Sequence, residues 1–354
     1  LSSAASDVYK RQVLSMNIKT EITKLHYDKN AKGVFLLDFA SVFYGFASNL
    51  KNRLYDKKIL KPERVDAYVI CVGNITTGGV GKTPVVSQIA NYFASKGEKT
   101  AIISRGYGGK LSNKNINVIS DGKSVFYNAR LAGDEPYWLA ENTKGVFVIT
   151  SKNRYKAAKY AVEKYGVTKI ILDDGFQHRK LYRDLDVVLM DSKMGFGNEK
   201  LLPAGPLREG MEAFARIDRL VVVSKDTDHK RAEKLAKIMG KKMKVKTSVC
   251  CTEPDYVYNI KTGERLADGA EITAFCAIGQ PKQFYDFLSN YKIKATKDFD
   301  DHHSYTEDEI PSGIVVTTEK DAVKMIEFKR DNIYALKLKT VIDVEELITM
   351  DSHL

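Results

Sequence analysis

Short apolar runs and longer amphipathic segments alternate along residues 65–216. The run 67–72, "AYVICV", is short and apolar, which is typical of a buried strand. After a glycine-rich segment, apolar residues recur at helical spacing in 85–97, "VVSQIANYFASKG". Further strand-bearing segments and one helix are predicted at 100–109, 145–150, 153–166, 168–179 and 184–191. This alternation predicts an α/β fold with a doubly wound parallel sheet, in which ligands bind at the carboxyl ends of the strands.

The pattern restarts near residue 217. A strand is predicted at 219–225 and a basic helix at 228–242. Two strand–turn–helix segments follow at 272–291 and 313–328. We therefore expect a second, smaller α/β lobe over residues 217–354, without a phosphate loop of its own.

The most apolar stretch, 34–47, lies near the N-terminus and is interrupted by Asp38. Its 14 residues are fewer than the roughly 20 that a membrane span requires. At helical spacing four large side chains share a face: Leu36, Phe39, Phe43 and Phe46. A basic run follows, up to Arg64. Region 16–64 therefore suits an interfacial helix on an anionic membrane surface, and equally a helix that packs on its own domain.

The first residues, "LSSAASDVYKRQ", have neither the apolar core nor the cleavage pattern of a signal peptide. We expect residues 1–15 to be a non-native leader, with the natural chain starting at Met16.

Composition narrows the possible partners. With 44% hydrophobic and 29% charged residues, the chain is typical of a globular protein. Its net charge of +11 favours phosphate-rich partners, namely nucleotides, nucleic acid or anionic lipid. The sequence lacks an aromatic–basic RNA signature, a helix-turn-helix pattern and zinc-finger spacing, so no nucleic-acid partner is expected.

The segment 73–84, "GNITTGGVGKTP", has the composition of a phosphate-binding loop between a strand and a helix. Glycines let backbone N–H groups turn toward anionic oxygens, Lys82 reaches the β and γ phosphates, and the Thr83 hydroxyl suits Mg²⁺. Thr76 stands where the usual GxxxxGK[ST] pattern has its first glycine. The predicted nucleotide-binding residues are Thr76, Thr77, Gly78, Gly79, Val80, Gly81, Lys82 and Thr83.

Two aspartates end a second strand. Asp173 and Asp174 follow the apolar run of 168–179, and carboxylates at such a strand end beside a phosphate loop bind Mg²⁺. Asp174-Gly175 alone is also typical of a simple turn. The combination with the phosphate loop favours the metal site.

Three further segments carry candidate chemistry with more than one interpretation. Asp134 and Glu135 begin a helix, where the local pattern favours capping over a role as general base. Residues 201–210, with Arg208 and Glu209, suit a rigid active-site loop or a connector. His302 and His303 lie beside acids, but no third spaced His or Cys supports zinc, and a His–Asp acid–base pair is as plausible.

Taken in order, these motifs resemble those of the tetraacyldisaccharide 4'-kinases of lipid A biosynthesis. The resemblance runs from about Leu36 to Lys324 and includes a phosphate loop without its first glycine. Its eight motifs are "GNITTGGVGKTP", "SRGYGG", "GDEP", "LDDGFQHR", "LPAGPLREG", "AIGQPKQF", "DHHSY" and "TTEKDAVK".

The resemblance implies a P-loop kinase that uses Mg²⁺ and ATP. Its acceptor would be the 4'-hydroxyl of a tetraacylated lipid A disaccharide 1-phosphate. Asp134 would be the base, His302 rather than His303 its partner, and Lys82 the ligand of the transferring phosphoryl. The implied Mg²⁺ residues are Thr83, Asp173, Asp174 and Glu209. The implied substrate-binding residues are Arg105, Tyr107, Glu135 and Gln177.

The resemblance also implies a location and excludes some partners. The enzyme would act at the cytoplasmic face of the bacterial inner membrane, as a peripheral or monotopic protein bound through region 16–64, and no obligate protein partner is expected. The alternative is a P-loop switch ATPase that acts in partitioning or partner assembly, since "GGVGKT" suits that class as well.

Overall fold

The structure is a computed structural model that describes residues 24–27, 35–113, 116–225, 228–279, 281–300 and 303–349. The expected leader, 1–15, and the expected start at Met16 lie outside these residues. The chain forms two compact units. The first comprises Leu1–Val223, Ala232–Val249 and Asp343–Leu354, and the second comprises Ser224–Arg231 and Cys250–Ile342.

The first unit contains a mostly parallel sheet. Its strand order is β7 (Arg219–Ser224), β6 (Leu185–Asp191), β1 (Tyr68–Asn74), β5 (Lys169–Asp173), β2 (Thr100–Ser104), β4 (Val146–Thr150) and β3 (Asn117–Asp121). Neighbours are parallel except for the edge strand β3, which is antiparallel to β4. Strands such as β2 and β6 are buried along their whole length, as parallel strands covered on both faces require. The predicted α/β class is confirmed.

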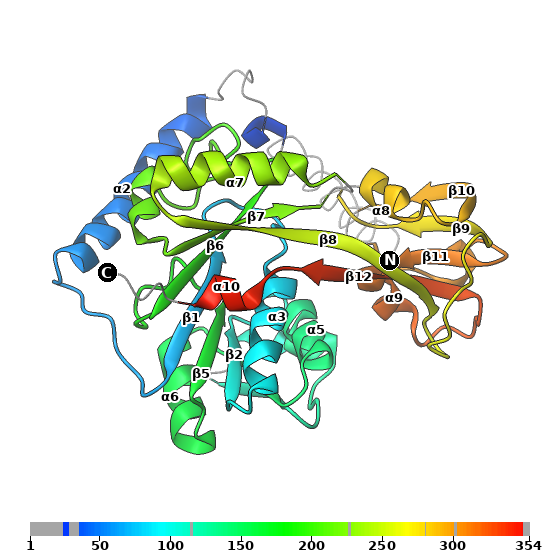
Figure 1. Cartoon of the computed structure of the whole chain (residues 1–354), viewed down its shortest axis with the longest axis horizontal. Helices are drawn as coiled ribbons and strands as arrows, with labels where there is room; N and C mark the ends of the chain where they lie inside the picture. Colours follow the sequence, from blue (N-terminus) through cyan, green and yellow to red (C-terminus); the bar gives the residue numbers. More distant parts are fainter. Residues whose placement is uncertain are drawn as a thin grey trace, which may run out of the picture. The chain divides into compact units, whose positions relative to one another are not determined.

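In the first unit, helices are found after the phosphate loop, from Asp134 onward, over most of 153–166 and over most of 228–242, as the sequence predicted, whereas the short helices at 129–132 and 344–348 were not predicted. The helices of this unit are α2 (Phe35–Asp56), α3 (Lys82–Ser95), α4 (Ala129–Ala132), α5 (Asp134–Asn142), α6 (Arg154–Tyr165), α7 (Lys230–Met243) and α10 (Val344–Ile348), with the 3-10 turns η1 (Lys110–Asn113) and η2 (Met211–Arg216). Helix α3 packs on β1, β2 and β5, and α6 packs on β2 and β4 (Figure 1). This arrangement places the phosphate loop at the carboxyl end of β1, beside the carboxyl end of β5.

The second unit has its own hydrophobic cores and contains the remaining strands, apart from residues 246–249. The strands are β10 (Lys292–Asp298), β9 (Glu271–Cys276), β11 (Val315–Thr318), β12 (Ile333–Val341) and β8 (Lys246–Asn259), parallel except for β8 against β12. The helical segments are α8 (Pro281–Phe287), α9 (Glu319–Ala322), η3 (Glu307–Glu309) and η4 (Val323–Met325). The boundary expected near residue 217 lies close to the first crossing between the units. Most of α7 and all of α10, within the expected lobe 217–354, belong to the first unit.

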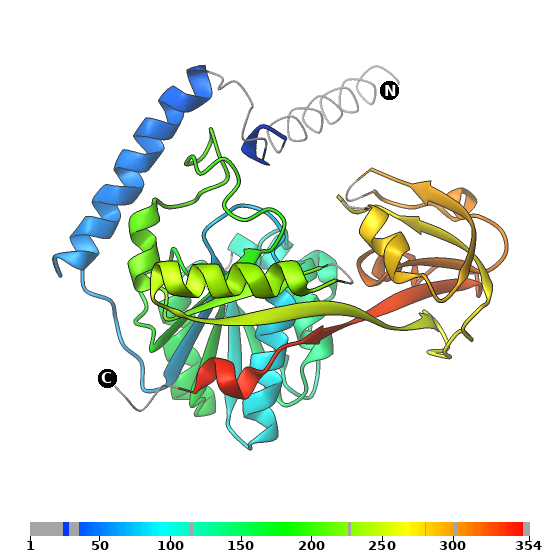
Figure 2. The same cartoon turned by 45° about the horizontal axis from the view of Figure 1, so that its top comes forward.

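Helix α2 is one unbroken helix (Figure 2), and most of its large apolar side chains are exposed. Its buried residues are the small Ser41 and Gly45, and an added Cβ at Gly45 would lie 2.7 Å from a Leu201 methyl. In contrast, Leu36, Phe39, Phe43 and Phe46 are 56–71% exposed. Within the described part of the chain, none of the helices combines the length and the apolarity that crossing a membrane requires.

Candidate functional site

The phosphate loop needs glycine at two positions because of its backbone, not because of crowding. Gly78 has φ +108° and Gly81 has φ +92°, in the region that residues with a Cβ rarely adopt. A Cβ at either position would meet no atom closer than 3.6 Å. Gly81 is also the residue immediately before α3, so its left-handed turn points the N-terminus of that helix at the loop.

Thr76 takes the place of the missing first glycine because the chain is extended there. Its backbone pairs with Leu207 in a β-bridge, and the N–H of Thr77 donates to the carbonyl of Pro206 at 2.7 Å. The Asn74 amide donates to the Thr76 carbonyl at 2.6 Å. An extended, buried threonine needs no left-handed backbone, so the loop starts without a glycine.

A row of charged side chains connects the phosphate loop to the end of β5. Lys82 Nζ lies 3.5 Å from Asp174 Oδ1 and donates to Asn74 Oδ1 at 3.2 Å. Arg208 Nη1 donates to both carboxylate oxygens of Asp174 at 2.9 Å. Burial raises the pKa of Asp174, but Lys82 and Arg208 outweigh that effect and leave it below its usual value. Asp174 is therefore ionised and held at the loop.

Asp173 lies in the opposite electrostatic environment. Burial, together with the nearby charge of Glu135 and the smaller effect of Asp174, raises its pKa to about 7, although Lys82 opposes the shift. Its Oδ2 accepts a hydrogen bond from Ser104 Oγ at 3.1 Å. Asp174 has φ +52°, and this left-handed turn sends the two adjacent carboxylates to different surroundings. The structure thus brings Glu135 close to the predicted acidic pair.

Arg154 is a site residue that the sequence analysis missed. It is the first residue of α6 and is only 7% exposed. Burial and the nearby Arg105 lower its pKa, while Asp174 and Asp173 oppose that shift. Its Nε is buried without a hydrogen-bond partner. A buried guanidinium beside the strand-end carboxylates supplies a further fixed positive charge for phosphate oxygens.

The motifs "SRGYGG" and "GDEP" are packed backbone to backbone. A Cβ at Gly109 would lie 2.5 Å from the backbone of Ala132, and one at Gly133 would lie 2.7 Å from the Tyr107 carbonyl. Asp134 is exposed at the start of α5, where the preceding residue is glycine and provides no side-chain cap. Tyr107 is 84% exposed. This packing explains Gly109 and Gly133 and leaves Asp134 and Tyr107 accessible.

Two of the predicted residues make internal contacts. The Gln177 amide donates to the Asn74 carbonyl at 3.0 Å, which connects it to the phosphate loop. Glu209, predicted for Mg²⁺, is 3% exposed, and its carboxylate pairs with Arg216. Arg216 in turn lies over the Phe176 ring, 4.4 Å from its centroid.

The remaining donors suit a hard divalent cation. Across the described ranges, no three or more His, Cys, Asp or Glu side chains are grouped so as to hold a metal ion. Mg²⁺ in phosphate chemistry needs fewer, because one or two carboxylates suffice beside phosphate oxygens and water. Thr83, Asp173 and Asp174 provide only oxygen donors, and the raised pKa of Asp173 shows a carboxylate whose ionisation a cation would favour.

In the second unit, two residues of "TTEKDAVK" connect that unit's motifs. The buried carboxylate of Asp321 accepts from the N–H of Ala277 at 2.9 Å, and Lys324 Nζ donates to the His303 carbonyl at 2.9 Å. The His303 ring stacks on Phe299 and lies 3.2 Å from Glu309. His302 lies outside the described residues, so its predicted pairing with Asp134 stays a prediction.

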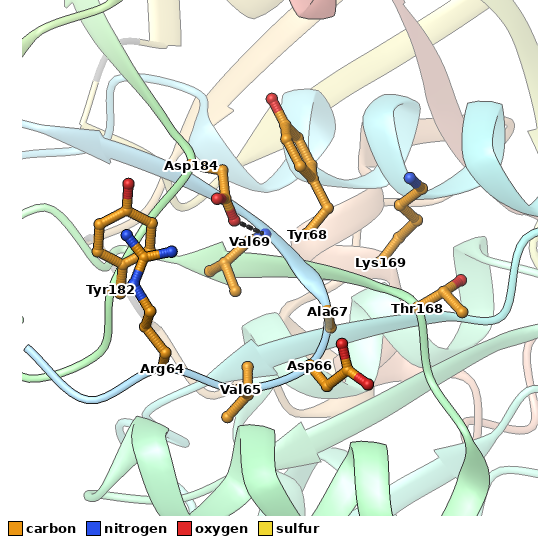
Figure 3. Close-up of a pocket in the computed structure, with 10 residues that line it drawn as sticks. All are labelled: Arg64, Val65, Asp66, Ala67, Tyr68, Val69, Thr168, Lys169, Tyr182 and Asp184. Carbon is orange, nitrogen blue, oxygen red and sulfur yellow. Dashed lines mark hydrogen bonds between the residues drawn. The ribbon is translucent and has the colours of Figure 1, made fainter.

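A separate open pocket of about 480 Å³ lies at the other end of the sheet (Figure 3). Its lining includes Tyr68 and Lys169, at the amino ends of β1 and β5. Arg64 lies over the Tyr182 ring, 3.4 Å from its centroid, and Asp184 accepts from the N–H of Val69. These polar groups already have partners, and the pocket is not part of the phosphate site.

Comparisons with known proteins agree with this arrangement. A family model described as tetraacyldisaccharide-1-P 4'-kinase (LpxK) matches residues 34–352. The chain is 36% identical over 329 residues to the tetraacyldisaccharide 4'-kinase of Halothermothrix orenii, which covers 85% of this chain and 84% of the relative. For the enzyme of the same name from Desulfotalea psychrophila, identity is 37% over 328 residues, or 87% of this chain and 93% of the relative.

A solved structure is also similar. It is the crystal structure of the "apo" form of LpxK from Aquifex aeolicus in complex with ATP. The TM-score is 0.71 at 34% identity, and the match covers 86% of this chain and 94% of that chain.

Proposed function

Because the chain belongs to the tetraacyldisaccharide-1-P 4'-kinase family, we propose that its phosphate site transfers the γ-phosphoryl group of ATP to the 4'-hydroxyl of a tetraacylated lipid A disaccharide 1-phosphate. The proposal rests on the row Lys82–Asp174–Arg208 at the phosphate loop, together with the exposed Asp134 at the start of α5. Family membership favours this kinase function over the switch ATPase.

The phosphate loop and three cations would bind and orient the triphosphate. Backbone N–H groups around Gly78–Gly81 and the N-terminus of α3 provide positive dipoles. Lys82, Arg208 and Arg154 add charge where negative charge spreads over the phosphoryl oxygens. Positioning and charge neutralisation supply most of the rate enhancement in phosphoryl transfer.

Thr83, Asp173 and Asp174 would hold Mg²⁺. A bound Mg²⁺ would neutralise negative charge on the phosphate groups. Ser104 and the fold of β5 fix the Asp173 carboxylate in place. Glu209 would act by positioning, since its carboxylate is already paired with Arg216.

Asp134 would accept the proton of the sugar hydroxyl as that oxygen bonds to the γ-phosphorus and ADP leaves. Its exposed carboxylate at the amino end of α5 is accessible to an acceptor. Arg105 and Tyr107, on the adjacent glycine turn, would contact the acceptor or the phosphates. His302 would orient or tune Asp134.

The acceptor lies in a lipid surface, and α2 would bring the enzyme to it. Helix α2 buries Ser41 and Gly45 and exposes four large apolar side chains. A surface helix of a soluble protein normally does the reverse and packs its large apolar side chains against the core. The exposed face of α2, followed by basic residues, suits the cytoplasmic face of an anionic inner membrane.

A phosphoryl-transfer assay tests the proposal. Purified protein, Mg²⁺-ATP and detergent-dispersed lipid A disaccharide 1-phosphate would be followed by mass spectrometry for one added phosphate. Wild-type protein should form the product, and Asp134→Ala should lose most of its turnover, on the order of 10²-fold or more, while still binding ATP. His302→Ala and His303→Ala, compared side by side, test which histidine assists.

Each outcome has a distinct meaning. Product from the wild type and from Asp134→Ala at similar rates would remove Asp134 as the base and keep the kinase. ATP hydrolysis without phosphorylated lipid would instead favour the switch ATPase.

A further inference from the structure

Helix α2 donates hydrogen bonds to two loops of the candidate site. Tyr44 Oη donates to the carbonyl of Arg208 at 2.8 Å. About two helical turns further on, Lys51 Nζ donates to the carbonyl of Gln177 at 2.9 Å. The two acceptors belong to different loops, one after β6 and one after β5.

Each acceptor residue also contacts the phosphate site through another group. The N–H of Arg208 donates to the carbonyl of Ile75 at 2.7 Å, and its guanidinium holds Asp174. The Gln177 amide donates to the carbonyl of Asn74 at 3.0 Å. Both contacts therefore fix the two residues that lead directly into the phosphate loop.

We propose that Tyr44 and Lys51 are positioning residues, through which the helix with the exposed apolar face holds the two loops that align the phosphate loop and Lys82. Their side chains act on backbone carbonyls, so the loops are held whatever the loop side chains bind. Misplacement of reacting groups by about 1 Å can cost on the order of 10²-fold in rate, so small loop shifts matter.

Other contacts attach α2 to the same unit independently of these two donors. Arg179 donates to the Asn52 carbonyl at 3.0 Å and pairs with Asp56 at 2.7 Å. Ser41 Oγ donates to the Leu201 carbonyl at 2.9 Å. Removal of Tyr44 Oη or Lys51 Nζ therefore leaves the helix in place and releases only the loop carbonyl.

The test compares Tyr44→Phe, Lys51→Met and the double variant with the wild type. Affinity for ATP is measured by equilibrium titration without lipid, and kcat and KM by the phosphoryl-transfer assay. We expect the double variant to lose about tenfold in kcat and several-fold in ATP affinity, with the KM for the lipid acceptor unchanged. If the two side chains only stabilised the fold, the double variant would have a lower Tm, but its folded form would keep the kcat and the lipid KM of the wild type.

Two controls make the result specific. Lys51→Arg keeps a hydrogen-bond donor at this position, so its kcat should stay within about twofold of that of the wild type. Arg53→Met removes a cation from the same helix, and among the described residues no hydrogen bond from the Arg53 side chain to either loop is found, so ATP affinity should stay unchanged.

The proposal rests on the kinase function for its turnover measurement but not for its ATP titration. If no lipid product forms while the double variant still weakens ATP binding, the kinase function fails and the positioning role stands. If the folded double variant keeps kcat and ATP affinity within twofold of the wild type, the positioning role is overturned.

Discussion

Arg208 holds Asp174 by one nitrogen that donates to both carboxylate oxygens at 2.9 Å. Lys82 approaches the same carboxylate at 3.5 Å, so a single acid lies between two cations. Because Arg208 already satisfies the Asp174 charge, Lys82 can turn toward a phosphate without leaving an unpaired carboxylate behind. Arg208 therefore influences how readily Lys82 leaves Asp174 to bind a phosphate.

Arg208→Gln should therefore weaken ATP binding. Without the guanidinium, Asp174 retains only Lys82 and competes with phosphate for that ammonium. Charged hydrogen bonds contribute about 1.5–3 kcal/mol, so the KM for ATP should rise roughly ten- to hundredfold in steady-state kinetics. Arg208→Lys keeps a cation there and should show a smaller effect. An unchanged KM for ATP in Arg208→Gln would contradict this account.

Asp173→Asn should stabilise the nucleotide-free protein while it abolishes turnover. The folded-state pKa of Asp173 is raised to about 7, so its ionised form disfavours folding, fully above about pH 7 and less as pH falls toward the unfolded-state value. The gain in Tm should be a few degrees at pH 8 and smaller at pH 5.

Asp174→Asn is the matched control, and its expected change in Tm has the opposite sign. Its pKa is lowered in the fold by Lys82 and Arg208 against the effect of burial, so its charge stabilises the protein above its unfolded-state pKa. Thermal melts of both variants at pH 5 and pH 8 check the pair. Equal Tm changes for the two variants at pH 8 would refute the assigned environments.

Features of the site could be predicted from the sequence where their chemistry follows from a local pattern of residues. The strand–glycine turn–helix order, the two aspartates at the end of β5 and the motif order identified the fold and the family, and both are confirmed. Arg154 was missed because an arginine at the start of a lysine-rich helix is normally solvent-exposed, and only the tertiary fold buries it. Likewise, no local signal assigns α10 to the first unit, since that depends on long-range packing.

The three loop glycines should differ in their tolerance of alanine. Gly78 and Gly81 have positive φ, and a left-handed backbone costs a residue with a Cβ about 1–2 kcal/mol. Gly78→Ala and Gly81→Ala should lower both Tm and ATP affinity. Gly79, exposed and without positive φ, has no atom within 4 Å of an added Cβ, so Gly79→Ala should keep its Tm. Thermal melts and ATP titrations of the three variants test this explanation. If Gly79→Ala lowered Tm as much as Gly81→Ala, positive φ would not be the cause of the difference.

The exposed face of α2 should determine binding to lipid. Burial of a phenylalanine side chain contributes about 1.5–3 kcal/mol, so Phe43→Ser with Phe46→Ser should weaken co-sedimentation with anionic vesicles at least tenfold. Phe126, which is 51% exposed elsewhere in the first unit, provides the control Phe126→Ser, with binding unchanged. Binding of the wild type should also weaken with salt if the basic residues after α2 contact lipid phosphates, because salt screens such contacts. Vesicle binding that is equal for the double variant and the wild type would show that another surface makes the contact. The detergent-dispersed substrate would still be phosphorylated in that case, which separates membrane contact from the chemistry of the site.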